Sequence, residues 1–436
     1  TGPARGHSLM KTRADSRGER VLGTMQNCAN GYTPWGTYLT CEENWSDIFT
    51  NPGGNISALE KRYGIGKSED SYRWSEVDER FNSEKNPNEP NRFGWVVEID
   101  PFDPKSTPRK HTALGRFKHE GAKVTIAPDG RLAVYMGDNQ RFEYIYKFVS
   151  KNRYQPGNRA ANMRLLEEGT LYVARFNENG SGDWLALVHG QNGLTAANGF
   201  ADQGEVLVKT RMAADLVGAT KMDRPEWITA DPFTAGSIYC TLTNNSQRGQ
   251  EGKPAADAAN PRANNLFGHI IHWQEADGDG TKLSFKWDIL VLAGNKQAAK
   301  PEHKGNINGD DFGSPDGLAF DNRGVLWIQT DVSTSTLNMK EYAGMGNNQM
   351  VATVLGSNEY RRFLTGPNGS EITGIAFTPD NKTMFINIQH PGEPSKGDSD
   401  PARPTAVSTW PDGAAAGRPR AATVVITKND GGVIGS

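Results

Sequence analysis

Cysteine is scarce in this sequence. Its 436 residues include three cysteines, Cys28, Cys41 and Cys240. Three cysteines cannot form a disulfide framework, and none stands in the C-x-x-C spacing of structural zinc or dithiol redox sites. A disulfide-stapled scaffold and a zinc finger are therefore excluded.

An excess of one charge and long hydrophobic runs are also missing. The chain has 48 Lys and Arg against 51 Asp and Glu, a formal net charge of -3, so it has no basic field and we expect no nucleic-acid-binding module. It has no run of about 18 apolar residues, so we expect no membrane span. Long amphipathic stretches are few, whereas 49 Gly and 24 Pro indicate many short strands joined by turns.

What the sequence does contain is a repeated two-stranded hairpin. Each copy has a short apolar strand, a turn of Pro, Asp, Asn or Gly, and a second strand rich in β-branched and aromatic residues. The copies span residues 119–139, 225–245, 315–331 and 371–390, with a looser fifth copy at 23–44. Hairpins repeated without regular helices between them are typical of the blades of a β-propeller.

The spacing between the copies predicts large insertions in this all-β propeller. We expect loops at residues 78–95, 150–165, 192–222 and 245–265, with short helices in NRAANMRLLEEG and TRMAADLVGATKM. Residues 391–421 are interpreted as an irregular excursion before a last strand, ATVVITK, at 422–428. No domain boundary is evident, so residues 1–436 are predicted to form a single β-propeller domain.

Acidic residues recur at one place in the repeat. A carboxylate is expected just before the first strand in four copies: Glu120, Glu226, Asp316 and Glu371. The start of one hairpin strand and the end of the next meet at the same end, so these groups should gather around the mouth of the propeller channel. Closely spaced carboxylates raise one another's pKa unless a cation neutralises them. A metal site is the simplest interpretation, and capping of solvated turns is the alternative for any single acid.

The stretch TPWGTYLTCEEN ends in Cys41, Glu42, Glu43 and Asn44, a thiol followed by three oxygen ligands. Oxygen ligands on flexible loops favour calcium, whereas a thiolate in the same cluster favours a softer or more Lewis-acidic ion such as iron. Cys41 is thus interpreted as a ligand, and a small buried hydrophobe is the alternative.

The segment RPEW places Arg224 two residues before Glu226. Residues two apart on an extended segment face the same side, so both should face the channel mouth. An arginine beside a carboxylate is either a structural ion pair or a partner for phosphate. His119 should point away from its neighbour Glu120 and is interpreted as structural.

Several long stretches together resemble the PhoX family of bacterial alkaline phosphatases. They are NCANGYTPWGTYLTCEEN, GRFKHEGA, MGDNQRFEYIYKF, MDRPEWI, NPRANNLFGHII, GSPDGLAFD, EITGIAFTPD and RPRAATVVITKNDGGVIGS. The resemblance runs over essentially the whole chain. It implies a six-bladed propeller that hydrolyses phosphate monoesters with two Fe3+ and three Ca2+ ions around a bridging oxide.

The resemblance also implies roles for individual residues. Cys41 would be the thiolate ligand of iron, Glu120, Glu226 and Asp316 would be carboxylate ligands of the same cofactor, and Arg224 would contact substrate phosphate. The match extends to Glu42, Glu43 and Glu371, which we assign to the metal site, and to Asn260 and Arg262, which receive no specific role.

The family further implies export by the twin-arginine pathway to a periplasmic or secreted location. Family members have a substantial segment before the position that matches Thr1, so we expect this chain to lack its N-terminal segment. We expect a monomer whose partners are phosphate monoesters and inorganic phosphate.

Two other functions are compatible with the repeat. A calcium-dependent propeller lactonase or phosphotriesterase would use the same oxygens without a thiolate, and iron content distinguishes it. A non-enzymatic binding propeller would use calcium only to stabilise loops, and turnover of a phosphate monoester distinguishes it.

Overall fold

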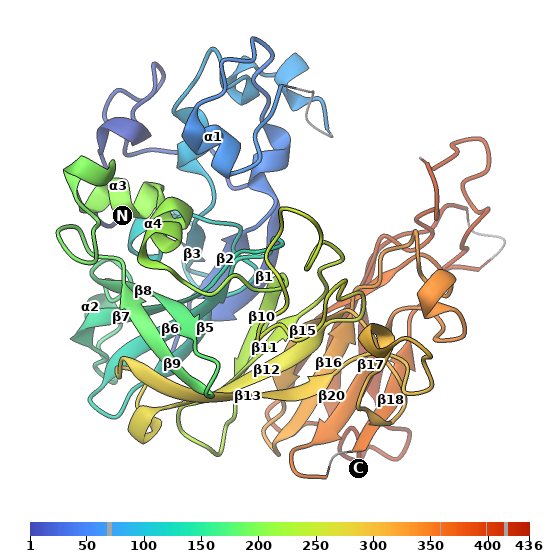
Figure 1. Cartoon of the computed structure of the whole chain (residues 1–436). Helices are drawn as coiled ribbons and strands as arrows, with labels where there is room; N and C mark the ends of the chain where they lie inside the picture. The colour runs from blue at the N-terminus through green and yellow to red at the C-terminus, as the bar shows by residue number, and fades with distance from the viewer. Residues whose placement is uncertain (68–71, 358, 398, 414–416) are drawn as a thin grey trace. The chain divides into compact units, whose positions relative to one another are not determined.

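The computed structural model describes residues 1–67, 72–357, 359–397, 399–413 and 417–436. This part of the chain is nearly all-β, with a few short helices (Figure 1). The chain divides into two compact units. The first unit comprises Thr1–Pro225 and Gln274–Lys286, and the second comprises Glu226–Trp273 and Trp287–Ser436.

Two sheets form the framework of the first unit. One has the order β1-β2-β3-β4, and the other runs β9-β8-β7-β6-β5, with residues 284–286 of β13 paired to β9. The strands are β1 (Asn27–Tyr32), β2 (Tyr38–Glu42), β3 (Val96–Ile99), β4 (Arg109–His111), β5 (Lys123–Ile126), β6 (Arg131–Gly137), β7 (Ile145–Arg153), β8 (Gly169–Phe176), β9 (Ser181–Ala186) and β13 (Ser284–Leu292).

Short helices fill the connections of the first unit. The α-helices are α1 (Ala58–Arg62), α2 (Arg159–Asn162), α3 (Gln203–Val208) and α4 (Thr210–Val217). The 3-10 helices are Ser8–Met10, Trp45–Ile48, Trp74–Glu76, Glu79–Phe81, Glu89–Arg92, Thr112–Leu114, Ala196–Asn198 and Ala276–Gly278. Helix α1 begins with a capping box, because Ser57 and Glu60 each accept the other's backbone N–H.

The second unit contains three sheets, of orders β10-β11-β12-β13, β14-β18-β17-β16-β15 and β19-β20-β21. The strands are β10 (Pro225–Ala230), β11 (Ser237–Leu242), β12 (His269–Glu275), β14 (Asn308–Gly309), β15 (Pro315–Phe320), β16 (Val325–Thr330), β17 (Gln349–Val354), β18 (Glu359–Thr365), β19 (Glu371–Phe377), β20 (Thr383–Gln389) and β21 (Ala422–Thr427). Its 3-10 helices are Pro301–His303 and Lys340–Tyr342.

The predicted hairpins are confirmed. The pairs β1–β2, β5–β6, β15–β16 and β19–β20 are antiparallel, and β10 neighbours β11. The expected meeting of their ends is also confirmed, since Glu371 pairs with Gln389 and Pro315 with Thr330. In the β5–β6 turn, Asp129 accepts from the backbone N–H of Arg131, and Gly130 supplies the positive φ.

Helix and strand predictions outside the hairpins have mixed outcomes. Helix α4 and strand β21 lie where they were expected, and α2 is a single turn within NRAANMRLLEEG. The loop expected from residue 150 begins later, because β7 continues to Arg153. The described residues of 391–421 contain neither helix nor strand, as predicted, whereas 398 and 414–416 lie outside the described residues.

Each unit has its own apolar core. In the first unit, side chains such as Leu132, Val134, Phe148 and Leu171 pack together. In the second, Ile270, Leu318, Ile328 and Val351 do so. No helix in the described ranges has the length and apolar character that a membrane crossing needs.

A buried ion pair fixes the later segment of the first unit. The Lys147 ammonium lies 3.2 Å from Glu275, and both side chains are 0% exposed. Tyr135 and Trp184 donate further hydrogen bonds to the Glu275 carboxylate. The segment Gln274–Lys286 is thus held to β6, β7 and β9 by charge as well as by packing.

Candidate metal centre

The start of β1 (Asn27–Tyr32) brings a thiol toward the segment that precedes β5. The β1–β2 register shifts between Asn27 and Asn30, and such a bulge re-aims the side chains of the bulged strand. Gly31 allows close approach, because a Cβ there would lie 1.9 Å from the Ala122 carbonyl oxygen. The Ala122 N–H donates to the Asn30 carbonyl. Cys28 therefore lies beside the segment that carries Glu120.

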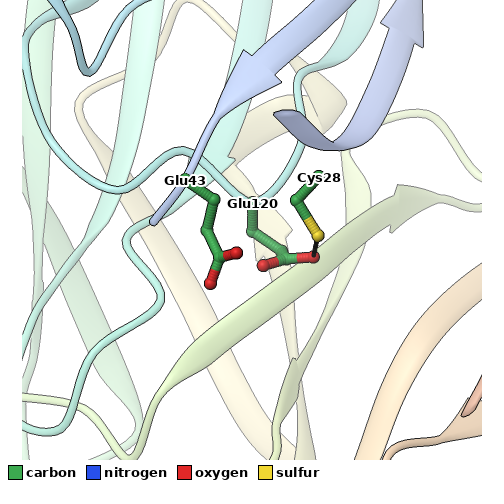
Figure 2. Close-up of side chains that lie close together, drawn as sticks. All are labelled: Cys28, Glu43 and Glu120. Carbon is green, nitrogen blue, oxygen red and sulfur yellow. Dashed lines mark hydrogen bonds between the residues drawn. The ribbon is translucent and has the colours of Figure 1, made fainter. Parts of the chain in front are cut away.

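Cys28, Glu43 and Glu120 form a compact group of possible metal ligands. One ligand atom from each lies within 4.8 Å of the others. The Cys28 thiol donates to Glu120 Oε1 at 3.1 Å. Figure 2 shows the polar ends of the three side chains together, with this hydrogen bond dashed. Glu43 and Glu120 are buried, whereas Cys28 is exposed.

Amide groups hold the two carboxylates. Asn139 Nδ2 donates to Glu43 Oε1 at 2.8 Å and to Glu120 Oε2 at 3.2 Å. Asn44 Nδ2 donates to Glu43 Oε2 at 2.5 Å. Arg224 Nε in turn donates to Asn139 Oδ1 at 3.0 Å. The side-chain amide of Asn139 thus links Arg224, the predicted phosphate contact, to the carboxylates of Glu43 and Glu120.

The electrostatics of this group favour a cation. Burial, followed by the neighbouring charge of Glu120, raises the pKa of Glu43 to about 8, although Lys118, Arg224 and Asn139 oppose the shift. A metal ion would relieve both the burial cost and the repulsion. One sulfur with carboxylate oxygens is a donor set that suits iron, and carboxylates alone suit calcium. The residues therefore fit a metal cofactor.

The structure gives Cys41 and Glu42 different surroundings. Cys41 is fully buried in the apolar core of the first unit, and burial is the main cause of its raised pKa. The Glu42 carboxylate accepts from Lys110 Nζ at 2.7 Å and from the backbone N–H groups of Gly94 and Trp95. Neither belongs to the described group of candidate ligands around Glu43, so their ligand roles remain predictions.

Three predicted ligands belong to the second unit. Glu226 and Asp316 are buried, and their carboxylate oxygens lie within 4.8 Å of each other. The register of β15 also shifts between Pro315 and Leu318, beside Asp316. Glu371 accepts from Gln389 at 3.0 Å and lies 3.5 Å from His390 Nε2.

Arg224 does not have the extended backbone on which the sequence argument relied. Its φ of 58° lies in the left-handed region, immediately before Pro225, and such a conformation costs a non-glycine residue about 1–2 kcal/mol.

His119 is structural as predicted: it is buried, stacks on Phe117 and contacts the Gly115 carbonyl through Nε2. Asn260 and Arg262 bond to Asp257 and to the Ala293 carbonyl, respectively.

Sequence reasoning missed Cys28 and Asn139. A signal for Cys28 was present, because it lies at the start of the first strand in the looser hairpin copy, the place that an acid occupies in the other four copies. The β-bulge that turns Cys28 toward Glu120 leaves no comparable mark in the residue types. For Asn139, only its position at the end of a second strand was informative.

Repeated hairpins that carry buried carboxylates and a thiol at their ends define a propeller-like, nearly all-β protein with a candidate metal centre. The chain belongs to the PhoX family of alkaline phosphatases: the family model described as "Alkaline phosphatase PhoX" matches residues 1–392. It is accordingly a metal-dependent phosphatase. The number of blades and the single domain remain predictions.

A solved relative agrees with this assignment. Pseudomonas fluorescens PhoX, in complex with the transition-state analogue vanadate, is 50% identical at a TM-score of 0.93, covering 100% of this chain and 75% of that one. No curated protein sequence matches the chain.

Two remote structures are much less similar. Kuenenia stuttgartiensis hydrazine synthase is 15% identical at a TM-score of 0.32, covering 85% of this chain and 84% of that one. Pseudomonas aeruginosa periplasmic gluconolactonase is 10% identical at a TM-score of 0.27, covering 67% of this chain and 70% of that one. Similarities this low carry no weight for fold or function.

Proposed function

We propose that this chain hydrolyses phosphate monoesters with a cofactor that contains Fe3+ and Ca2+, and releases inorganic phosphate. The group formed by Cys28, Glu43 and Glu120, with ligand atoms within 4.8 Å of one another, is the observation that carries the proposal. A lactonase-type calcium site would need only oxygen ligands, whereas this group includes a thiol.

The proposed ligands in the first unit are Cys28, Glu43 and Glu120, and those in the second are Glu226, Asp316 and Glu371. The bound cations would offset the charge of phosphate and of its transition state. Arg224 would hold phosphate oxygens through its planar guanidinium, in a position set by its contact with Asn139. Vanadate, which binds the Pseudomonas fluorescens relative, should also inhibit this chain.

The proposal also covers the location, the physiological role and the oligomeric state of the enzyme. We propose a periplasmic or secreted location and a role in phosphate acquisition, which membership of the family supports, and we propose that the enzyme acts as a monomer.

Substitution of each thiol by serine tests the ligand assignment. A serine hydroxyl is not deprotonated at neutral pH as a metal-bound thiol is. We therefore expect Cys28→Ser to lose most of its iron and to lower kcat for a generic monoester at least tenfold. After chelation, its melting temperature should match that of the chelated parent, because Cys28 is exposed. Iron per chain and kcat are the measurements.

Cys240→Ser is the matched control, since Cys240 is buried in β11 and belongs to no group of candidate ligands in the described chain. It should keep its iron while losing some stability. Cys41→Ser separates the two thiols: iron loss there, with iron retained in Cys28→Ser, would return the ligand role to Cys41. Iron retained in all three variants would contradict a thiolate ligand.

A further inference from the structure

We propose that Asn139 is a positioning residue that orients the Glu43 and Glu120 carboxylates and the Arg224 guanidinium through one side-chain amide. The inference rests on the proposed function and extends it to a residue that is neither a predicted ligand nor a predicted phosphate contact. The same amide would then position both the proposed metal ligands, Glu43 and Glu120, and the proposed phosphate contact, Arg224.

The backbone of Asn139 is held in place. Its N–H donates to the Lys118 carbonyl at 3.0 Å, and the Lys118 N–H donates to the Asp138 carboxylate at 3.2 Å. Asp138 is in turn paired with Arg211, whose Nε donates at 2.8 Å, and both side chains are 0% exposed. Residue 139 therefore starts from a fixed position, as a positioning residue must.

The amide has one chemically acceptable orientation here. Nδ2 carries two hydrogens, and the two contacts at 2.8 and 3.2 Å direct them to two different carboxylates. Oδ1 accepts from Arg224 at 3.0 Å. A flipped amide would set its oxygen against two carboxylates and its NH2 against a guanidinium N–H, so every contact would become unfavourable. The three partners thus select one rotamer, and the amide fixes all three in return.

An amide suits this position better than a charged group. An aspartate of the same shape could accept from Arg224 but could not donate to Glu43 or Glu120, and it would add a third negative charge. A lysine could donate to the carboxylates but could not accept from the guanidinium. Asparagine does both without changing the net charge.

A double-mutant cycle between Asn139→Ala and Arg224→Lys tests the shared constraint. Each single variant should raise KM for a monoester and the inhibition constant of inorganic phosphate about tenfold, because each removes the oriented guanidinium. The double variant should be little worse than either single one. Iron per chain, measured independently of turnover, should also fall in Asn139→Ala because the carboxylates lose a common donor.

Asn139→Asp separates the two halves of the role and is nearly isosteric, so it remains informative if the alanine variant does not fold. Its iron content should fall, while the metal-loaded fraction should keep phosphate inhibition within about twofold of the parent. Asn198→Ala is the matched control, since Asn198 is exposed and its amide donates to the Gly193 carbonyl at 2.8 Å. It should match the parent in every measurement.

Additive losses in the cycle, or unchanged KM, phosphate inhibition and iron in Asn139→Ala, would overturn the inference. Failure of the proposed function gives a different result, because the parent chain itself would then lack iron or monoester turnover.

Discussion

At the scale of single residues, Glu43 has two conflicting requirements. Burial and the neighbouring Glu120 favour its neutral form, whereas binding a cation requires its charged form. In the metal-free chain the carboxyl therefore retains its proton to a higher pH than an exposed glutamate does. Protons and metal ions compete for this carboxylate.

This competition predicts a pH dependence of stability for the metal-free chain. The folded pKa of Glu43, about 8, exceeds the ordinary value of 4.5, so the folded state binds more protons than the unfolded state between these values. Its contribution to the free energy of unfolding is present below about pH 4.5 and is lost as the pH rises through 8. The melting temperature of the chelated protein should therefore fall between pH 5 and 9.

Glu43→Gln provides the comparison, because glutamine does not titrate. Its melting temperature should decline less over the same pH range. Parallel curves for the parent and Glu43→Gln would show that Glu43 titrates normally. Iron uptake by the parent should rise over the same interval, in the direction opposite to the change in stability.

At the scale of elements, the approach of β1 to the Glu120 segment depends on the absence of a side chain at Gly31. A Cβ at this position would lie 1.9 Å from the Ala122 oxygen, so β1 or the segment near Ala122 would have to move. The β1 bulge carries Cys28 only three residues away. Displacement of β1 should therefore change the position of Cys28 relative to Glu120.

Gly31→Ala should lower the free energy of unfolding by about 1–3 kcal/mol through overpacking and should also reduce iron per chain. Gly66→Ala is the control, because no heavy atom of the described residues, apart from the chain neighbours of Gly66, lies within 4 Å of a Cβ built there. It should change stability by less than about 1 kcal/mol in either direction. Denaturant unfolding and elemental analysis measure the two effects. A stable Gly31→Ala variant with full iron would show that β1 relaxes without moving Cys28.

The sequence predicted those helices and strands that are determined by residues close to one another along the chain. The hairpins, α4 and β21 follow from strand alternation, turn residues and helix-forming composition, and all are present. The β1 bulge and the clearance at Gly31 depend on another strand's position, so residue types along β1 did not indicate them. The predicted ligand role of Cys41 rested on the acids beside it in the sequence and remains a prediction, whereas the contact of Cys28 with Glu120 depends on the fold. The capping box of α1 is a local signal too, since Ser57 and Glu60 stand in the S-x-x-E spacing.

At the scale of the whole molecule, bound cations should contribute to stability as well as to catalysis. An ion that binds only the folded state raises the free energy of unfolding, by about 2.7 kcal/mol when the free ion concentration is 100 times Kd. Exhaustive chelation should therefore abolish monoester hydrolysis and lower the melting temperature. Scanning calorimetry and a monoester assay on the same sample measure both, and restored iron and calcium should reverse both changes. Full activity in a chain free of metal would refute metal dependence.

The discontinuity of the first unit has a consequence for synthesis on the ribosome. Its first segment ends at Pro225, and the segment Gln274–Lys286 that completes it follows only after 226–273. Until Glu275 leaves the exit tunnel, the nascent first unit lacks the counter-charge for Lys147, and an uncompensated buried charge costs about 3–5 kcal/mol. Vectorial folding of the first unit can therefore be completed only after part of the second has been translated.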